Sequence, residues 1–178
     1  EAIGNPELTG AWLIWGQSGS GKTTFVMQLC KYLTQFGRVA YNSMEEADGE
    51  SIKLALIRVN MLEVRTRFIL LPNESINELK ERLRKHKSPD IIIIDSLQYS
   101  ELTYKGYKEL REEFKHKLFV IISHSEGKEP EGKVGKKIRY DAFVKIRVEG
   151  YRAFVVSRYG GGKHLDVWAE KAQEYHGL

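Results

Sequence analysis

GQSGSGKTT, running from Gly16 to Thr24, is the stretch of sequence that decides the fold. It follows the apolar run from Ala11 to Trp15 and leads into KTTFVMQLCKYLTQF, which has helical periodicity. The pattern G-x-x-x-x-G-K-[ST] is met by Gly16, Gly21, Lys22 and Thr23. Glycines let backbone amides approach an anion closely, and a helix beginning near Gly21 would direct unsatisfied N–H groups and the positive end of its dipole at that anion. The stretch predicts a phosphate-binding loop (P-loop) between a strand and a helix.

Each part of this loop has an expected role in holding a nucleoside triphosphate. Lys22 would neutralise the β- and γ-phosphates, and the Thr23 hydroxyl would be a ligand of Mg²⁺, which prefers octahedral oxygen coordination. The expected nucleotide-binding residues are Gly16, Gln17, Ser18, Gly19, Ser20, Gly21, Lys22, Thr23 and Thr24. The alternative is a Gly- and Ser-rich surface turn.

The composition is that of an ordinary globular domain. Of 178 residues, 42% are hydrophobic and 29% charged, which fits a single domain over residues 1–178. The apolar runs are too short to span a bilayer and no signal peptide is visible, so we expect no membrane partner. The single cysteine, Cys30, cannot form an intrachain disulfide and favours a reducing, cytoplasmic setting. The formal net charge of +4 permits an anionic partner without requiring one.

Short β-branched runs alternate with helical stretches, a pattern typical of βαβ units and a mostly parallel, twisted sheet flanked by helices. We expect an α/β fold with strands at 12–15, 38–43, 67–71, 91–95 and 118–123, and helices at 50–60, 75–86 and 104–117. The second of these helices starts at SINE, a capping box. Residues 141–158 alternate around Glu149 and Gly150, which predicts a C-terminal antiparallel β-hairpin extension. The segment 128–137 has the most loop-like composition.

A second chemical feature is DIIIIDS, in which four isoleucines lead to Asp95 at the end of a buried strand. Behind a P-loop, this aspartate is expected to hold the Mg²⁺ shell beside the Thr23 hydroxyl. Many P-loop ATPases place a water-activating glutamate directly after it, but here that position is Ser96. The catalytic base is therefore expected elsewhere, and Glu45, at the end of the second strand, is the best candidate, with Glu46 as its competitor. The alternative is that both are solvated carboxylates at the start of a helix.

Another polar group, His124, with Ser123 before it, ends a buried strand at FVIISH. A polar residue there could contact the γ-phosphate and report whether it is present. The alternative is a strand-end histidine bonded to a backbone carbonyl.

Together these residues resemble the RecA-like ATPase core of RecA, RadA-like recombinases and hexameric replicative helicases. The resemblance implies that Glu45 is the catalytic glutamate, that Asp95 and Ser96 form Walker B, and that His124 is the sensor. The late VSRYGG is similar to a basic element of RadA-like proteins that approaches a neighbouring subunit's nucleotide, and Arg158 is its only basic member here. The resemblance therefore also implies a homo-oligomer, either a hexamer or a filament. Because no zinc-binding segment or oligomerisation domain is seen, we expect a core-only member, similar to small phage or prophage recombination ATPases.

The same resemblance places the loops after the fourth and fifth strands against single-stranded DNA. In YSELTYKGYK, tyrosines alternate with lysines, a combination that suits unstacked bases and phosphates. In SEGKEPEGKVGKKIR, lysines are partly offset by glutamates, and solvation alone is the alternative. The candidate contacts are Tyr99, Tyr104, Lys105, Tyr107 and Lys108 in the first loop, and Lys128, Lys133, Lys136, Lys137 and Arg139 in the second.

We therefore expect Mg²⁺-dependent ATP binding and hydrolysis, coupled to single-stranded DNA in recombination, repair or replication. Lys22 and Thr23 would bind phosphate and metal, Glu45 would orient water, and Arg158 would stabilise transition-state charge at a neighbour's nucleotide. Two alternatives stay open. One is a small-molecule or nucleotide kinase, which shares GSGKTT, and the other is a nucleotide-gated assembly module with little turnover.

Overall fold

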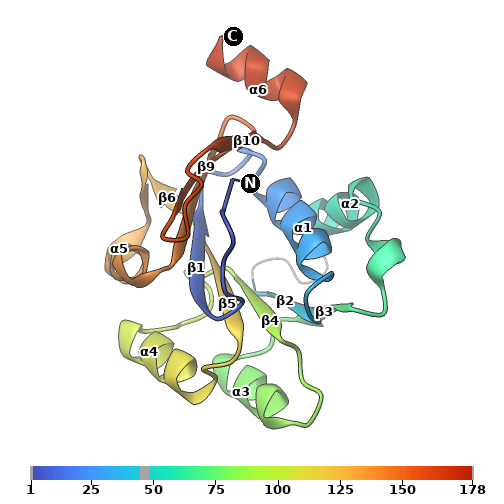
Figure 1. Cartoon of the computed structure of the whole chain (residues 1–178), viewed down its shortest axis with the longest axis vertical. Coiled ribbons are helices and arrows are strands. Elements are labelled where there is room, and N and C mark those ends of the chain that lie inside the picture. The colour runs from blue at the N-terminus through green and yellow to red at the C-terminus, as the bar shows by residue number, and fades with distance from the viewer. Residues whose placement is uncertain (1, 45–48, 178) are drawn as a thin grey trace.

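The computed structural model describes residues 2–44 and 49–177. An eight-stranded sheet with the order β10-β9-β8-β1-β5-β4-β2-β3 forms its centre (Figure 1). Strands β1 to β5 and β8 run parallel to their neighbours in this set, whereas β9 pairs antiparallel with β8 on one side and with β10 on the other. The strands are β1 Gly10–Trp15, β2 Val39–Ser43, β3 Phe68–Pro72, β4 Ile91–Asp95, β5 Leu118–Ser123, β8 Val144–Glu149, β9 Arg152–Ser157 and β10 His164–Asp166.

Helices cover both faces of the sheet (Figure 1). One face carries α1 and α2, whose apolar residues share a core with alternate side chains of the central strands, and the other carries α3, α4 and α5. The helices are α1 Lys22–Leu33, α2 Glu50–Arg58, α3 Ile76–Arg84, α4 Tyr104–Glu113, α5 Gly132–Asp141 and α6 Ala169–His176, with a 3₁₀ turn, η1, at Met61–Val64. A separate small hairpin joins β6, Ser125–Glu126, to β7, Glu129–Pro130. None of the described helices is long and apolar enough to cross a bilayer.

The central strands are buried on both faces, as parallel strands covered by helices require. In β1, Trp12 and Ile14 face the α1 side while Ala11 and Leu13 face the α5 side, and all four are at most 1% exposed. The four isoleucines of β4 are likewise fully buried. The α/β fold with a mostly parallel sheet and a C-terminal antiparallel hairpin is confirmed.

The parallel register brings the carboxyl ends of the strands to one edge of the sheet. Trp15 lies opposite Ser123, and Ser43 lies opposite Asp95. Because the P-loop follows Trp15 directly, the two polar strand ends and the loop meet at this edge.

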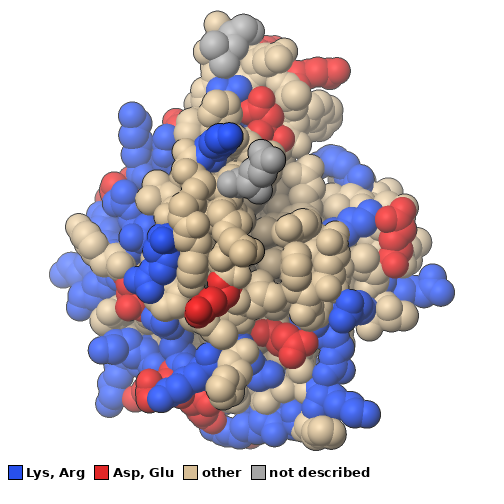
Figure 2. Space-filling view, viewed as in Figure 1, with Lys and Arg blue, Asp and Glu red and all other residues tan. Residues whose placement is uncertain are grey.

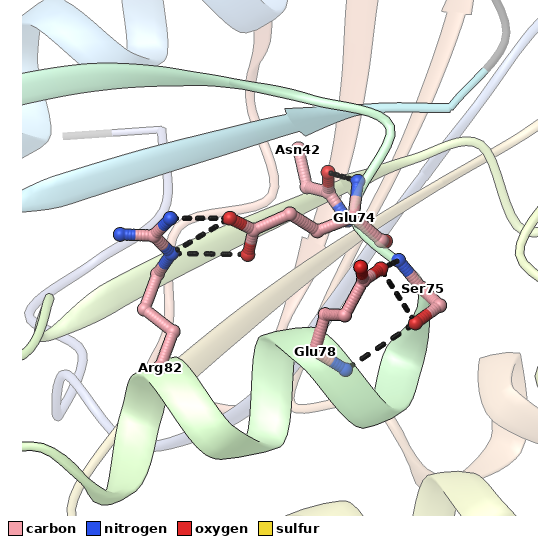
Figure 3. A network of polar contacts seen from close by, with 5 residues as sticks. All are labelled: Asn42, Glu74, Ser75, Glu78 and Arg82. Carbon is pink, nitrogen blue, oxygen red and sulfur yellow. Dashed lines mark hydrogen bonds and ion pairs between the residues drawn. The ribbon is translucent and has the colours of Figure 1, made fainter.

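A network of polar contacts fixes the loop after β3 beside β2 (Figure 3). The buried Asn42 accepts a hydrogen bond from the Glu74 N–H at 2.9 Å and donates one to the Glu74 carbonyl at 2.7 Å. The Glu74 carboxylate in turn accepts from Arg82 Nε, 3.0 Å from each oxygen. Next to it, Ser75 and Glu78 form the capping box expected from SINE, which is confirmed. The network holds the end of β2 in register just before the site.

The C-terminal half differs from the sequence-based expectation in two ways. The hairpin of β8 and β9 is part of the main sheet, because β8 pairs in parallel with β1. The expectation of a loop over 128–137 was wrong, since α5 begins at Gly132. Val134, Ile138 and Ala142 recur every four residues and pack against the core, but surrounding lysines and glycines obscured this pattern.

Candidate nucleotide-binding site

The P-loop has the backbone of an anion cradle. Gly19 and Gly21 have φ angles of 74° and 90°, a left-handed region in which glycine is far less strained than other residues. Gly21 is the N-cap of α1, and no side chain caps this helix end. The first N–H groups of a helix have no intrahelical acceptor, so this uncapped end is suited to bind a phosphate. The backbone of the loop and the uncapped start of α1 therefore support the expectation of a phosphate-binding loop.

The turn of the β8–β9 hairpin supports this loop from behind, a contact that has no signature in the sequence. The Tyr151 N–H donates to the Ser20 carbonyl at 2.9 Å. A Cβ atom at Gly16 would lie 2.3 Å from the Val148 carbonyl oxygen, and one at Gly21 would lie 2.8 Å from the Tyr151 ring. Side chains at these two glycines would therefore force the loop away from the hairpin.

The Lys22 ammonium lies between the loop and the end of β5. Its Nζ atom donates to the Gly16 carbonyl at 2.9 Å and to the Ser123 carbonyl at 3.4 Å. Both acceptors are neutral oxygens, and a polyphosphate would be a stronger acceptor for the same ammonium.

One cavity of about 970 Å³ connects the expected site residues. Its lining includes Lys22, Thr23 and Thr24 from α1, Asp95 from the end of β4, and His124 from the end of β5. Ser43, the last residue of β2, also lines it. Glu45 and Glu46 follow shortly after it in the sequence but lie outside the described residues, so the assignment of the catalytic base stays a prediction.

Asp95 is oriented by a buried tyrosine on the neighbouring strand. The hydroxyl of Tyr41, whose side chain is 0% exposed, donates to Asp95 Oδ2. This contact fixes the carboxylate at the wall of the cavity. The sequence showed Tyr41 only as a core residue of a strand, because its partner is 54 positions away.

Both the backbone and the ring of His124 make contacts that hold the residue in place. Gln98, in the turn after β4, accepts from the His124 N–H at 3.1 Å and donates to Ser123 Oγ at 2.9 Å. The His124 Nδ1 atom lies 3.5 Å from the Glu131 carboxylate, and its ring makes an edge contact with Tyr99. The end of β5 is therefore tied to the turn after β4 and to the residue that precedes α5.

The described residues contain no cluster of three or more His, Cys, Asp or Glu side chains that could hold a metal ion. A Mg²⁺ ion at this site would therefore depend on the Thr23 hydroxyl, the Asp95 carboxylate, phosphate oxygens and water. This donor set is the one that Mg²⁺ favours at phosphate sites, and Thr23 and Asp95 line the same cavity. The residues fit the ion.

Arg158 does not belong to this cavity. It directly follows β9. There its N–H donates to the Phe143 carbonyl, and its guanidinium lies 3.8 Å from the centre of the Phe143 ring. The side chain is exposed, and Ser157, which precedes it, pairs with Val144 at the start of β8, at the opposite end of the strands from the chain's own P-loop. Its expected action on a neighbour's nucleotide stays a prediction.

A basic and aromatic surface lies over α4 and α5, at the left and lower left of Figure 2, and further Lys and Arg side chains lie along the bottom and right of that view. Lys137 Nζ lies 5.4 Å and Lys108 Nζ 6.0 Å from the centre of the Tyr104 ring. Lys133, Lys136 and Lys105 are exposed nearby on the two helices, although Lys136 is paired with Glu126 at 3.0 Å. Tyr107 is excluded as a base-stacking residue because it is 0% exposed and donates to Asp141.

A parallel sheet with a glycine-rich loop between its central strand and a helix, and a carboxylate at the end of a nearby strand, defines a P-loop nucleotide-binding ATPase core of RecA-like type. The chain belongs to the ATPase family associated with various cellular activities (AAA), whose model matches residues 12–134.

Among curated proteins, the chain is 34% identical over 86 residues to the DNA repair protein RadA of Streptococcus pneumoniae and 30% identical over 87 residues to that of Chlamydia muridarum. Each match covers 48% of this chain but only 20% and 18% of the relative. The chain thus spans about a fifth of the length of these relatives.

Solved structures agree on the fold. One solved ATPase domain superposes with a TM-score of 0.64 at 15% identity, covering 94% of this chain and 84% of that one. The flagellar accessory protein FlaH from Methanocaldococcus jannaschii gives a TM-score of 0.56 at 18% identity, covering 92% and 78%. The KaiC-like protein PH0186 from Pyrococcus horikoshii OT3 gives a TM-score of 0.57 at 16% identity, covering 86% and 79%.

Proposed function

We propose that this chain binds and hydrolyses ATP with Mg²⁺ and that single-stranded DNA stimulates the reaction. The observation that carries the first part is the common cavity in which Lys22, Thr23 and Asp95 meet. Membership of an ATPase family supports the same reaction.

Catalysis here would consist of positioning and charge stabilisation. Backbone amides at the start of α1 and the Lys22 ammonium hold the phosphates, and Tyr41 holds the Asp95 carboxylate in the orientation that faces them. Thr23 and Asp95 would hold a Mg²⁺ ion, which would supply positive charge to the phosphates. Glu45, two residues beyond the end of β2, orients the attacking water and accepts its proton.

We expect Glu45→Gln to keep ATP binding within about twofold and to lower turnover by about 100-fold or more, because an amide cannot accept the proton of the attacking water. Glu46→Gln is the matched control on the adjacent carboxylate and retains turnover. Nucleotide affinity and steady-state phosphate release measure the two effects separately. Retained turnover in Glu45→Gln, with loss in Glu46→Gln, would assign the base to Glu46.

The coupling to DNA is supported by the basic and aromatic surface over α4 and α5. Gln98 and Glu131 connect this surface to the end of β5, where Ser123 meets Lys22. The similarity to proteins named for DNA repair agrees with such a role. A homo-oligomer in which Arg158 reaches a neighbour's nucleotide would complete the site.

Hydrolysis measured with and without single-stranded DNA tests this coupling. We expect stimulation in the wild type, and in the double variant Lys133→Glu, Lys137→Glu a ratio of stimulated to unstimulated rates that falls towards one. The control carries the same charge change at Lys85 and Lys163, exposed positions outside this surface, and keeps the wild-type ratio. Equal, negligible rates with and without DNA would instead indicate a nucleotide-gated module, and a phosphorylated small-molecule product would indicate a kinase.

A further inference from the structure

Arg58 contacts α1, the helix that follows the P-loop, and the function proposed above gives this contact no role. It is the last residue of α2, and its Nη1 atom donates to Thr24 Oγ1 at 2.7 Å. Thr24 is buried, whereas Arg58 is exposed, and both line the cavity that contains Lys22 and Asp95. An arginine from outside the loop therefore reaches the nucleotide cavity of its own chain.

The direction of this hydrogen bond has a chemical consequence. A guanidinium can only donate, so Thr24 must accept, and a threonine hydroxyl has one proton in addition to its lone pairs. With Arg58 on one lone pair, the hydroxyl proton points away from the guanidinium and is available to a second acceptor. The contact therefore prepares Thr24 to act as a donor in the cavity.

The distance also brings the guanidinium close to any anion bound at Thr24. A phosphate oxygen that accepts the Thr24 proton would lie within about 6 Å of Arg58 Nη1, because two successive hydrogen bonds span no more than this. The guanidinium is permanently charged and has further N–H groups with which to reach that oxygen.

Arg58 lies on the side of the cavity that is next to α6. Its Cζ atom lies 5.8 Å from the centre of the Trp168 ring, at the start of α6. Lys171 Nζ lies 4.2 Å from the same ring and 4.9 Å from that of Tyr151, which also lines the cavity. Lys22 instead reaches the Ser123 carbonyl at the end of β5, and in the function proposed above it holds the terminal phosphates there, together with Asp95 and His124.

We propose that Arg58 is a nucleotide-binding residue that acts on the α-phosphate, both directly and by orienting the Thr24 hydroxyl. The inference rests on the proposed function, because it requires that the P-loop binds a nucleotide. A role at the α-phosphate makes Arg58 matter equally for nucleoside di- and triphosphates, whereas a role at the γ-phosphate would concern the triphosphate alone.

Equilibrium binding of ATP and ADP to Arg58→Ala tests the proposal, with Arg58→Lys and Lys53→Ala as companions. We expect Arg58→Ala to weaken both nucleotides by about tenfold or more, because a charged hydrogen-bond donor is lost. Arg58→Lys retains the charge and binds with intermediate affinity. Lys53→Ala removes an equal charge from an exposed position of the same helix that does not line the cavity, and it binds like the wild type.

A double-mutant cycle with Thr24→Val separates a joint action from two independent ones. If Arg58 works through Thr24, the double variant loses clearly less affinity than the product of the two single losses. Wild-type affinity in Arg58→Ala would overturn the inference, and so would a loss confined to ATP. Failure of the wild type itself to bind ATP would instead overturn the proposed function, and thermal melting of each variant shows that it is folded.

Discussion

We expect the replacement of Lys22 by alanine to abolish ATP binding, with a loss of affinity of at least about 100-fold. The Lys22 ammonium is placed by its bonds to the Gly16 and Ser123 carbonyls at the point where the P-loop meets the end of β5. A triphosphate carries its highest charge density at the β- and γ-phosphates, and the remaining loop contacts come from neutral amides. Titration calorimetry or a fluorescent ATP analogue measures the affinity.

The matched control is Lys85→Ala, which removes the same charge from an exposed position at the end of α3 and leaves ATP binding unchanged. Since the Lys22 side chain lies at the edge of the sheet and not in the apolar core, we expect both variants to unfold at nearly the wild-type temperature. ATP binding by a folded Lys22→Ala protein at wild-type affinity would remove the basis for the P-loop assignment.

We expect the second large effect, on Mg²⁺-dependent hydrolysis, from the substitution Asp95→Asn. The substitution keeps the shape of the side chain and an oxygen that can accept from Tyr41, but it removes the negative charge that Mg²⁺ requires. We expect Mg²⁺-dependent hydrolysis to fall by about 100-fold or more, while ATP binding without Mg²⁺ stays close to that of the wild type. Hydrolysis measured over a range of Mg²⁺ concentrations distinguishes loss of the metal from loss of the nucleotide.

Asp90→Asn provides the comparison, because Asp90 precedes the same strand at the opposite edge of the sheet, where it accepts from the Arg38 N–H at 2.8 Å. Its hydrolysis rate should match that of the wild type at every Mg²⁺ concentration. If Asp95→Asn did so as well, the metal would have to be held by groups other than this carboxylate.

Much of the fold was predictable because its signals are local. The five expected parallel strands appear within about two residues of their predicted limits, since each is an apolar run bounded by polar or glycine residues. SINE predicted its helix start correctly for the same reason, as a capping box involves residues only three positions apart. Helix α5 was missed because its apolar contacts with the core come from Val134 and Ile138 and from Ala142 at its C-cap, which stand among lysines and glycines.

The residues of the candidate site also fall into two groups, those that the sequence predicted and those that it did not. Lys22, Thr23, Asp95 and His124 were expected from motifs, and the structure brings them to one cavity. Their supporting residues carry no motif: Tyr41 is a tyrosine in a buried strand, Gln98 lies in a turn, and Arg58 ends an amphipathic helix. Each can be recognised only once its partner is known.

The sequence by itself determined the P-loop, the alternation of strands and helices, and the identity of the polar residues at the strand ends, because each depends on spacings of a few residues along the chain. Only the tertiary structure decided which distant groups meet, such as Arg58 with Thr24 and Tyr41 with Asp95, which are 34 and 54 positions apart. The physical reason is the parallel register of the sheet together with the packing of α2 on α1. These bring strand ends and helix ends to a single edge without leaving a periodic trace in the sequence.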